Sequence, residues 1–270
     1  MRMRVGTCGW QYRSWRGVLY PADLPASRWL EHYATIFDTV ECDAAFYRLP
    51  AKETFAKWAA TVPAGFTMAV KASRFLTHVK RLADPAEPVA RLLDAASGLL
   101  DRLGPILVQL PPSLAADLDR LDACLACFPP SVRVAVEPRH PSWWTAETQA
   151  LLQRRGATLV WSDRLTIAQA PLWRTANFGY LRMHQGRADF PPDYHPQTLR
   201  KWLRRLHETW PAGDEEVFVF FNNDPGGAAV RDAMRMRRLG FAETGSDGRG
   251  GEYGLLAKEN GGHRSPRRGT

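Results

Sequence analysis

The sequence predicts an α/β protein in which residues 1–243 form a single (β/α)8 TIM barrel. Short apolar segments alternate with amphipathic segments through about eight units. The apolar segments lack a regular polar alternation, which is typical of parallel strands that are covered on both faces. The length of 270 residues also suits one barrel, because such barrels usually contain about 250 residues.

In the first half of the chain, each expected strand is followed by an expected helix. The strands are predicted at residues 4–8, 39–41, 66–71 and 106–109. Apolar residues spaced by three or four predict helices over 27–37, 54–62, 92–103 and 114–128. We expect Gly104-Pro105 to end the third of these helices, since glycine and proline are common just after a helix.

The second half begins with the most informative segment. Val132, Val134 and Val136 alternate as in a buried strand, and Glu137 should continue this strand because the residue before a proline is extended. Ser142 is predicted to be the N-cap of a helix that carries Trp143, Trp144, Leu151 and Leu152. Further strands are expected at 158–161, 179–182 and 217–221, and further helices at 199–210 and 225–239. The segment after the sixth strand lacks a helical period, so the sixth helix is weak or missing, and the Gly/Arg-rich tail at 244–270 is predicted to be disordered.

The composition is that of an ordinary globular protein. Hydrophobic residues make up 45% and charged residues 24% of the chain. The formal charge of +8 favours anionic partners, either phosphorylated metabolites or nucleic acid. No segment resembles a signal peptide or a membrane span, and four cysteines are too few for a disulfide framework, so we expect a cytoplasmic protein with reduced thiols and no membrane partner.

Polar residues stand at the carboxyl end of each predicted strand. In a (β/α)8 barrel these ends converge on one mouth, where active sites are found. Aromatic residues expected near the same mouth could stack on a sugar or a base: Trp10, Tyr12, Tyr47 and Trp143. The strand-end residues are Cys8, Glu41, Lys71, Gln109, Glu137 with Arg139 and His140, Asp163, Arg182 with His184, and Asn222 with Asn223.

Two chemistries fit this set. Glu41, Glu137, Asp163 and His184 have side chains that could bind a divalent cation, which would polarise an oxygen or activate water. Alternatively, the reaction is metal-free proton transfer by the glutamates and Lys71, with His184 or His140 moving protons. In both cases Arg139 and Arg182 would hold an anion, and Gln109, Asn222 and Asn223 would contact the substrate.

Each of these residues also has a structural interpretation. Glu137 and Arg139 could form a structural ion pair, and Lys71 could fill the barrel top between carboxylates without reacting. Asn222 and Asn223 could only end a strand, and His140 could only bond a carbonyl group.

Two further features bear on the site. Asp224-Pro225-Gly226-Gly227 opens the last predicted helix with an N-cap residue, a proline and two glycines, so Gly226 and Gly227 could bring backbone N–H groups to a phosphate. The alternative is an ordinary capped helix start. Cys8 and Cys42 end neighbouring strands, so a redox or metal role is open for this pair.

These motifs resemble those of the YecE-like family, whose domain is called domain of unknown function 72. The resemblance runs from about residue 4 to residue 242 and implies a (β/α)8 barrel with a polar mouth of unestablished activity. Cys8 stands where this family usually has a serine, and Cys42-Asp43-Ala44-Ala45 replaces a run that contains an asparagine. The matching motifs are Gly6-Thr-Cys-Gly-Trp10, Tyr20-Pro21, Thr39-Val-Glu41, Phe46-Tyr47, Lys71 with Thr77-His78, Gln109-Leu-Pro-Pro112, Glu137-Pro-Arg139-His140-Pro-Ser-Trp143, Trp161-Ser-Asp163, Arg182-Met-His184 and Phe221-Asn222-Asn223.

The leading hypothesis is an enzyme of hydrolase or isomerase type that acts on an anionic, phosphorylated or sugar-like substrate. In it, Glu137 is the general base or a metal ligand, with Glu41 and Asp163 beside it. Lys71, Arg139 and Arg182 would hold the anion, and His184 or His140 would move protons. The alternatives are a nucleic-acid-binding or nuclease-like protein and a protein that binds a metabolite without chemistry.

Overall fold

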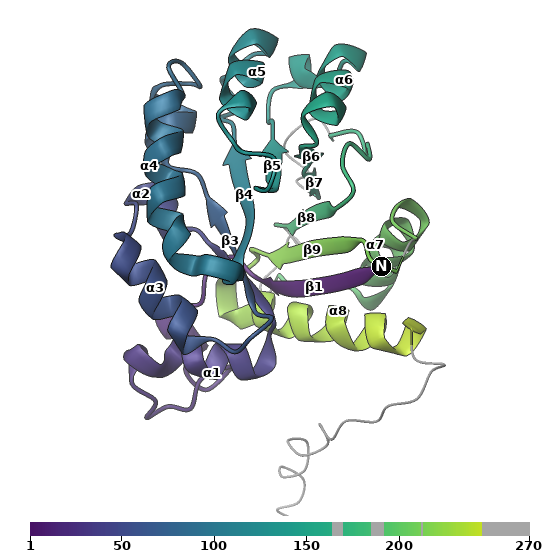
Figure 1. The fold of residues 1–270 in the computed structure, drawn as a ribbon. Helices are drawn as coiled ribbons and strands as arrows, with labels where there is room; N and C mark the ends of the chain where they lie inside the picture. The colour runs from purple at the N-terminus through teal and green to yellow at the C-terminus, as the bar shows by residue number, and fades with distance from the viewer. Residues whose placement is uncertain (164–169, 185–191, 212, 245–270) are drawn as a thin grey trace, which may run out of the picture.

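The computed structural model describes residues 1–163, 170–184, 192–211 and 213–244. It is an α/β fold in which every strand pairing is parallel (Figure 1). One sheet has the order β1-β9-β8-β7 and the other the order β2-β3-β4-β5-β6. The strands are β1 (Arg2–Thr7), β2 (Thr39–Cys42), β3 (Thr67–Lys71), β4 (Leu103–Gln109), β5 (Val134–Glu137), β6 (Thr158–Leu159), β7 (Trp161–Ser162), β8 (Gly179–Met183) and β9 (Glu216–Phe221).

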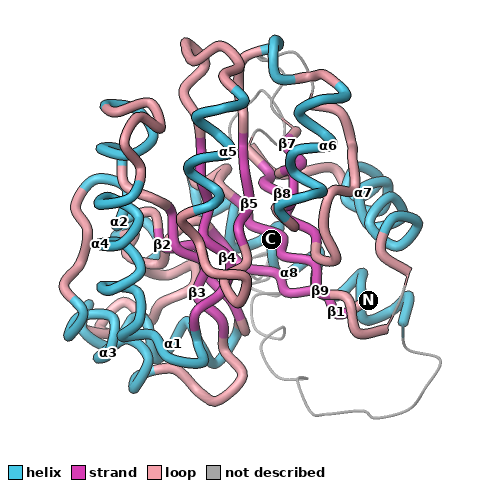
Figure 2. The backbone as a smooth tube through the Cα atoms, turned by 45° about the horizontal axis from the view of Figure 1, so that its top comes forward, coloured by secondary structure: helices cyan, strands magenta, loops and turns pink. Residues whose placement is uncertain are grey.

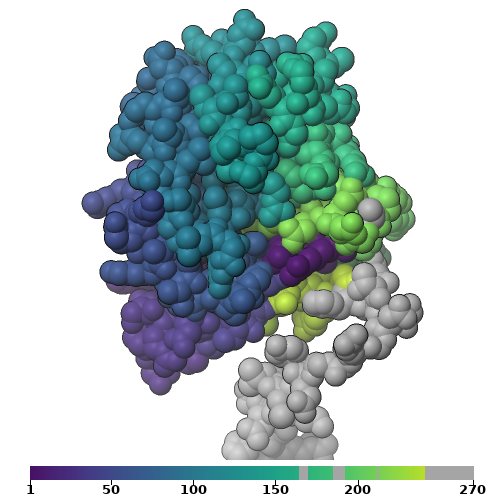
Figure 3. All heavy atoms as spheres, in the orientation of Figure 1, coloured from purple at the N-terminus to yellow at the C-terminus, as the bar shows by residue number. Residues whose placement is uncertain are grey.

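The two sheets meet at two places. At the first, Cys8 forms a parallel bridge with Glu41, and the N–H of Gly9 donates to the carbonyl of Glu41 at 2.8 Å. At the second, the chain passes from β6 in one sheet to β7 in the other through Val160. The expected sixth strand is therefore present as two short pieces. The first and last strands lie side by side, as the purple and green surfaces in Figure 3 show.

Helices lie around the strands (Figure 2). In the described part of the chain, no helix has the length and apolar character needed to cross a membrane. The α-helices are α1 (Trp29–Ile36), α2 (Ala44–Tyr47), α3 (Lys52–Thr61), α4 (Ala86–Ala96), α5 (Leu118–Ala126), α6 (Ala146–Arg155), α7 (Pro196–Thr209) and α8 (Ala228–Thr244). Short 3-10 turns cover Arg13–Trp15 (η1), Ala26–Arg28 (η2), Ser97–Arg102 (η4), Pro141–Trp143 (η5) and Pro225–Gly227 (η6), and Phe75–Val79 (η3) is a π-helical turn.

Several predicted boundaries are confirmed and others are wrong. Glu137 is the last residue of β5, as expected from Pro138. Ser142 is not a helix N-cap, because its hydroxyl accepts the N–H of Ala116 at 2.8 Å. Instead, Thr145 caps α6 by accepting the N–H of Thr148. The predicted helix over residues 142–152 therefore begins later, and the two tryptophans lie before it.

Three other predicted helices also differ from the structure. The long helix ends at Ala96 and continues as η4, so Gly104-Pro105 lies inside β4 and does not stop it. The next helix begins after the cap Asp117, whose carboxylate accepts the N–H of Arg120 at 3.0 Å. The last helix begins at Ala228, because Gly226 is left-handed with φ of 68°. No helix occurs in residues 170–178, and residues 164–169 and the tail from 245 lie outside the described part.

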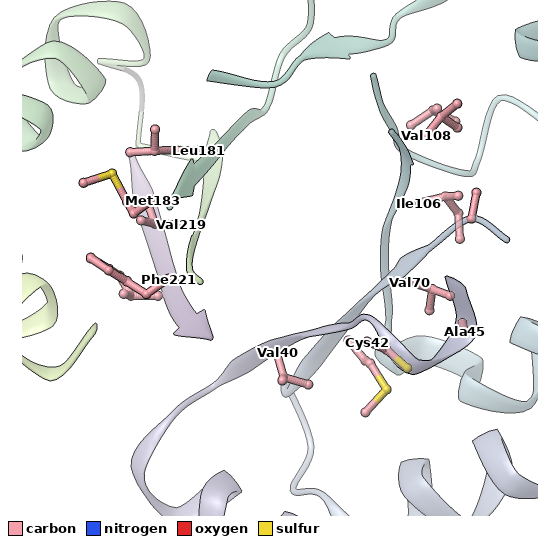
Figure 4. Close-up of a cluster of buried hydrophobic side chains, with 14 of the residues drawn as sticks. Val40, Cys42, Ala45, Val70, Ile106, Val108, Leu181, Met183, Val219 and Phe221 are labelled. Carbon is pink, nitrogen blue, oxygen red and sulfur yellow. The ribbon is translucent and has the colours of Figure 1, made fainter. Parts of the chain in front are cut away.

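The strands place apolar side chains on both of their faces. Figure 4 shows the outer set, including Val40, Val70, Val108 and Val219, which point away from the space between the two sheets. A separate buried cluster contains the alternate positions Cys8, Ala69, Leu107, Ala135, Val160, Phe178, Tyr180, Phe218 and Phe220. Because side chains alternate along a strand, the residues two positions further on share the side of this inner cluster. These are Lys71, Gln109, Glu137 and Arg182.

Candidate functional site

Arg182 is the centre of a buried ionic network at the carboxyl ends of the strands. Its side chain is 1% exposed. One guanidinium nitrogen, Nη1, donates to Oε2 of Glu137 at 2.7 Å, and the other, Nη2, donates to Oε1 of Glu41 at 2.6 Å. Arg182 belongs to one sheet and the two glutamates to the other. We call these three residues the Arg182 network, which satisfies charges that would otherwise be costly to bury.

Glu137 is held on both of its oxygens. Gln109 donates to Oε2 at 2.8 Å, and Arg139 donates to Oε1 through Nε at 3.0 Å and Nη2 at 2.9 Å. Burial raises the pKa of Glu137, but the charges of Arg182 and Arg139 outweigh burial and hold its pKa well below the usual value. Glu137 is therefore an ionised anchor and a weak base. This geometry favours an orienting role over the general-base role expected from the sequence.

Glu41 has the opposite electrostatic balance. The hydroxyl of Tyr180 donates to Oε2 of Glu41 at 2.5 Å, while Arg182 donates to Oε1. Burial raises the pKa of Glu41 above its ordinary value, because it outweighs the opposing charge of Arg182, and Asp43 raises it further. The two glutamates of the Arg182 network thus differ in proton affinity, which is how one site keeps two carboxyl groups in different roles.

The cysteines near the network are free thiols. Arg182 Nη2 lies 3.6 Å from Sγ of Cys8, and burial raises the pKa of that thiol well above its ordinary value. Cys42 is also free and buried, and burial raises its pKa to about 12. Both sulfurs are therefore protonated at neutral pH, which is the inert state for thiol chemistry.

The described residues do not fit a divalent cation. The side chains of Cys8, Glu41 and Asp43 bring their ligand atoms within 4.8 Å of one another. However, Arg182 Nη2 already lies among them, at 2.6 Å from Glu41 and 3.8 Å from Asp43. The guanidinium supplies the positive charge that a metal would bring. Among the described residues, the predicted ligands Glu41, Glu137, Asp163 and His184 do not form such a group.

The side chain of Asp163 binds the backbone of His184, the residue that follows β8. Oδ1 of Asp163 accepts the backbone N–H of His184 at 2.6 Å, and its other oxygen accepts the hydroxyl of Tyr194. The His184 ring contacts the amide of Asn222 through Nδ1 at 3.1 Å, and its Nε2 lies 3.8 Å from Oε1 of Glu137. Asp163 therefore orients His184, and His184 faces the Arg182 network.

A group of basic side chains lies beside this network. Lys71 Nζ lies 3.4 Å from Oδ1 of Asp43 and 4.4 Å from the ring centroid of Phe46. The His78 ring packs edge-on against the same phenyl ring, with centroids 5.0 Å apart. Burial, followed by the charges of Lys71, Arg139 and Arg74, lowers the pKa of His78. We call Lys71, Arg74, His78 and Arg139 the rim cluster.

Several other predicted site residues take part in packing or local hydrogen bonds. Trp143 is buried and donates to the carbonyl of Leu114 at 2.9 Å, and Trp10 is buried against Trp58, with ring centroids 5.0 Å apart. His140 Nδ1 bonds Ser142 at 2.8 Å. The structure does not bring these three side chains into the Arg182 network or the rim cluster.

Of the predicted tyrosines, Tyr12 donates to the carbonyl of Cys8 at 2.6 Å. Tyr47 follows Phe46 and is 82% exposed, so its ring is available beside the rim cluster. Asn223 donates to Asp232 at 2.9 Å and to the carbonyl of Pro192 at 2.8 Å, which turns it toward α8.

The two glycines before α8 have a packing explanation. Asp224 does not cap the helix, because its carboxylate accepts the ring N–H of Trp15. The N–H of Gly227 donates to the carbonyl of Asp224 at 2.8 Å. A Cβ atom at Gly227 would lie 2.9 Å from Cγ1 of Val18. The N–H of Gly227, which the sequence suggested for phosphate binding, is therefore engaged within the chain.

Three contributors to the site were not predicted. Tyr180 lies two residues before Arg182 on the same face of β8, so strand alternation could have identified it. Asp43 follows β2 directly, and His78 is the second residue of the Thr77-His78 pair quoted for the family resemblance. The segment after Lys71 has no regular spacing of apolar residues, so the sequence did not indicate that His78 lies at the site.

The architecture and motifs agree with comparisons to known proteins. The family model described as "Protein of unknown function DUF72" matches residues 4–247. The chain belongs to the DUF72 family. This confirms the family resemblance of its motifs, and the fold comparisons below agree with the parallel α/β architecture.

Relatives of this DUF72 chain occur in several bacteria. It is 24% identical to the UPF0759 protein YunF of Bacillus subtilis over 267 residues, covering 87% of this chain and 93% of YunF. It is 30% identical to the UPF0759 protein YecE of Escherichia coli K12 over 140 residues, covering 50% of this chain and 52% of YecE. A DUF72 family crystal structure from Thermotoga maritima matches with a TM-score of 0.78 and 27% identity, covering 88% of this chain and 99% of the other. One from Enterococcus faecalis, 21% identical, shares the fold with a TM-score of 0.74, covering 88% and 95%.

Proposed function

We propose that the two sheets together form one (β/α)8 barrel whose mouth carries the site. The Cys8–Glu41 bridge supports closure at one junction, and the passage from β6 to β7 supports it at the other. The inner cluster draws side chains from both sheets, as the interior of a small barrel does. The Arg182 network then lies directly above this interior.

At this mouth, the DUF72 protein acts as an enzyme of hydrolase or isomerase type on an anionic, phosphorylated or sugar-like substrate. The observation that carries the proposal is the rim cluster, in which three charged side chains and an imidazole lie together beside a buried network. Lys71 and Arg139 are largely buried, with side-chain exposures of 11% and 12%. In the free protein these two cations are paired with Asp43 and Glu137, and little water screens their charges from an incoming anion.

The rim cluster and the Arg182 network have different roles. Lys71 and Arg139 bind the anionic group of the substrate, and the exposed ring of Tyr47 stacks on its sugar-like part. The Arg182 network fixes Arg139 through their shared partner Glu137. A preorganised network of this kind holds binding groups in place without reorganisation during the reaction.

Binding of inorganic phosphate, measured by calorimetry at low salt, tests the anion site. Lys71→Met is expected to weaken phosphate binding by about tenfold, because it removes one charge-assisted contact. The matched control is Lys52→Met, since Lys52 pairs with Asp94 on the surface and is 51% exposed. Equal phosphate binding by the two variants contradicts the proposed site.

A screen of phosphate esters and sugar phosphates tests turnover. The proposed function predicts that at least one class is converted by the wild-type chain and that Arg139→Gln abolishes conversion while the chain stays folded. Tight binding without conversion across the screen supports the alternative of a metabolite-binding protein. A substrate that is converted equally by Arg139→Gln shows that the reaction occurs elsewhere.

A further inference from the structure

His78 lies on the π-helical turn η3 (Phe75–Val79), which follows β3. Its Nδ1 is 2.8 Å from Oγ1 of Thr77, a residue that is fully buried. The hydroxyl of Thr77 also bonds the carbonyl of Ser73 at 3.1 Å. These contacts hold the imidazole by one of its nitrogens.

The hydrogen bonds determine which ring nitrogen carries the proton. A carbonyl oxygen can only accept, so the single hydroxyl proton of Thr77 is donated to Ser73. The oxygen of Thr77 must then accept from Nδ1–H of His78. The neutral imidazole therefore has its lone pair on Nε2, which is the arrangement required of a proton acceptor.

The surroundings of His78 keep this ring neutral. Phe46 packs against its edge, and Lys71 lies over the same phenyl ring. Among the described residues, three cations act on His78: Lys71 from β3, Arg74 from the loop after it, and Arg139 from the segment after β5. Burial is the largest cause of its lowered pKa, and these cations lower it further.

We propose that His78 is the proton acceptor of the rim cluster through Nε2, and that its protonation is coupled to anion binding by Lys71 and Arg139. This inference rests on the proposed function, because it needs an anionic substrate at the rim. In the step, the Nε2 lone pair takes a proton from a substrate O–H or C–H. The electron pair of that bond stays on the substrate oxygen or carbon, and the imidazolium later returns the proton.

The coupling follows from the charges. An anion bound between Lys71 and Arg139 offsets the two positive charges that disfavour the imidazolium. Anion binding therefore raises the pKa of His78, so the substrate itself makes the base effective. By linkage, protonation of His78 strengthens anion binding to the same degree.

NMR of the full chain with 15N-labelled histidine tests both parts without a known substrate. Sulfate is the probe, because its charge is constant over the titration. We expect the Nδ1–H tautomer for neutral His78 and a rise of its pKa by about one pH unit at saturating sulfate. The signals of His32, which lies on α1 and bonds the carbonyl of Leu19 through Nε2, serve as the control and are expected not to respond.

Two variants separate the possible failures. Lys71→Met is expected to raise the pKa of His78 in the free protein and to reduce the rise of this pKa with sulfate. Thr77→Val removes the hydroxyl that accepts from Nδ1–H, so neutral His78 is expected to lose its preference for the Nδ1–H tautomer. Sulfate that binds without moving the pKa of His78 overturns this inference but leaves the anion site intact. An Nε2–H tautomer in the wild-type chain also overturns it, and absence of sulfate binding overturns the anion site as well.

Discussion

Replacing Glu137 with glutamine tests the Arg182 network most sharply. The carboxylate accepts from Gln109 and Arg182 on one oxygen and from Arg139 on the other. Glutamine offers one oxygen and turns an NH2 group toward donors, so it leaves a buried guanidinium without its counter-charge. Removing one partner of a buried ion pair costs about 3–5 kcal/mol. For a domain of this size each kcal/mol lowers Tm by about 2–4 °C, which gives a loss of roughly 6–20 °C.

Thermal unfolding at neutral pH, followed by circular dichroism, measures this loss. The matched control is Glu31→Gln, because Glu31 pairs with Arg28 on the surface with 52% of its side chain exposed, and we expect its Tm to be unchanged. A Glu137→Gln variant that melts within about 2 °C of the wild type refutes the stabilising role of the network, since the smallest expected loss is about 6 °C.

Acid titration of the same variant provides an independent check. The pKa of Glu137 is lower in the folded state than in the unfolded state, where it is about 4.3. Its contribution is therefore complete above the unfolded pKa and is lost as the pH falls through the folded pKa. The stability difference between wild type and Glu137→Gln should shrink in strong acid. A difference that is constant with pH contradicts this account.

Three further predictions use the same unfolding and binding measurements. Glu41→Gln is expected to lower the free energy of unfolding at pH 7 by less than Glu137→Gln does. Because the pKa of Glu41 is raised in the folded state, ionisation of Glu41 lowers stability as the pH rises. A larger loss for Glu41→Gln contradicts this prediction. Gly227→Ala is expected to lower the free energy of unfolding in urea by about 1–3 kcal/mol, since φ is +71° and the added Cβ would clash with Val18. The control is Gly213→Ala, where an added Cβ meets open space. Equal stabilities of the two variants contradict this prediction. The nucleic-acid alternative predicts DNA or RNA binding that falls steeply with salt, and salt-insensitive or absent binding removes it.

Much of the site could be predicted because it depends on strand geometry. Glu41, Lys71, Glu137 and Arg182 stand at the carboxyl ends of apolar segments, and parallel strands bring such ends together. What the sequence could not reveal was the partner of each charge. The pKa values of the two glutamates shift in opposite directions. At Glu137 the charges of Arg182 and Arg139 outweigh burial, whereas at Glu41 burial and the charge of Asp43 outweigh the nearby cations.

Two of the wrong boundaries have a common physical cause. Ser142 and Thr145 are both good N-cap residues, three positions apart, and a tertiary hydrogen bond from Ala116 engages the first. Asp224 is likewise engaged by Trp15, which is distant in the sequence. His78 was missed for a related reason, since its position depends on a π-helical turn that has no sequence period.

A crystal of the full chain soaked in selenate tests anion binding at the mouth, because selenium can be located by its anomalous scattering. We expect a selenate ion at the mouth within hydrogen-bonding reach of Lys71 Nζ and the guanidinium of Arg139, with His78 beside it. An absence of selenate there, with Lys71 still paired to Asp43, would contradict the proposed anion site.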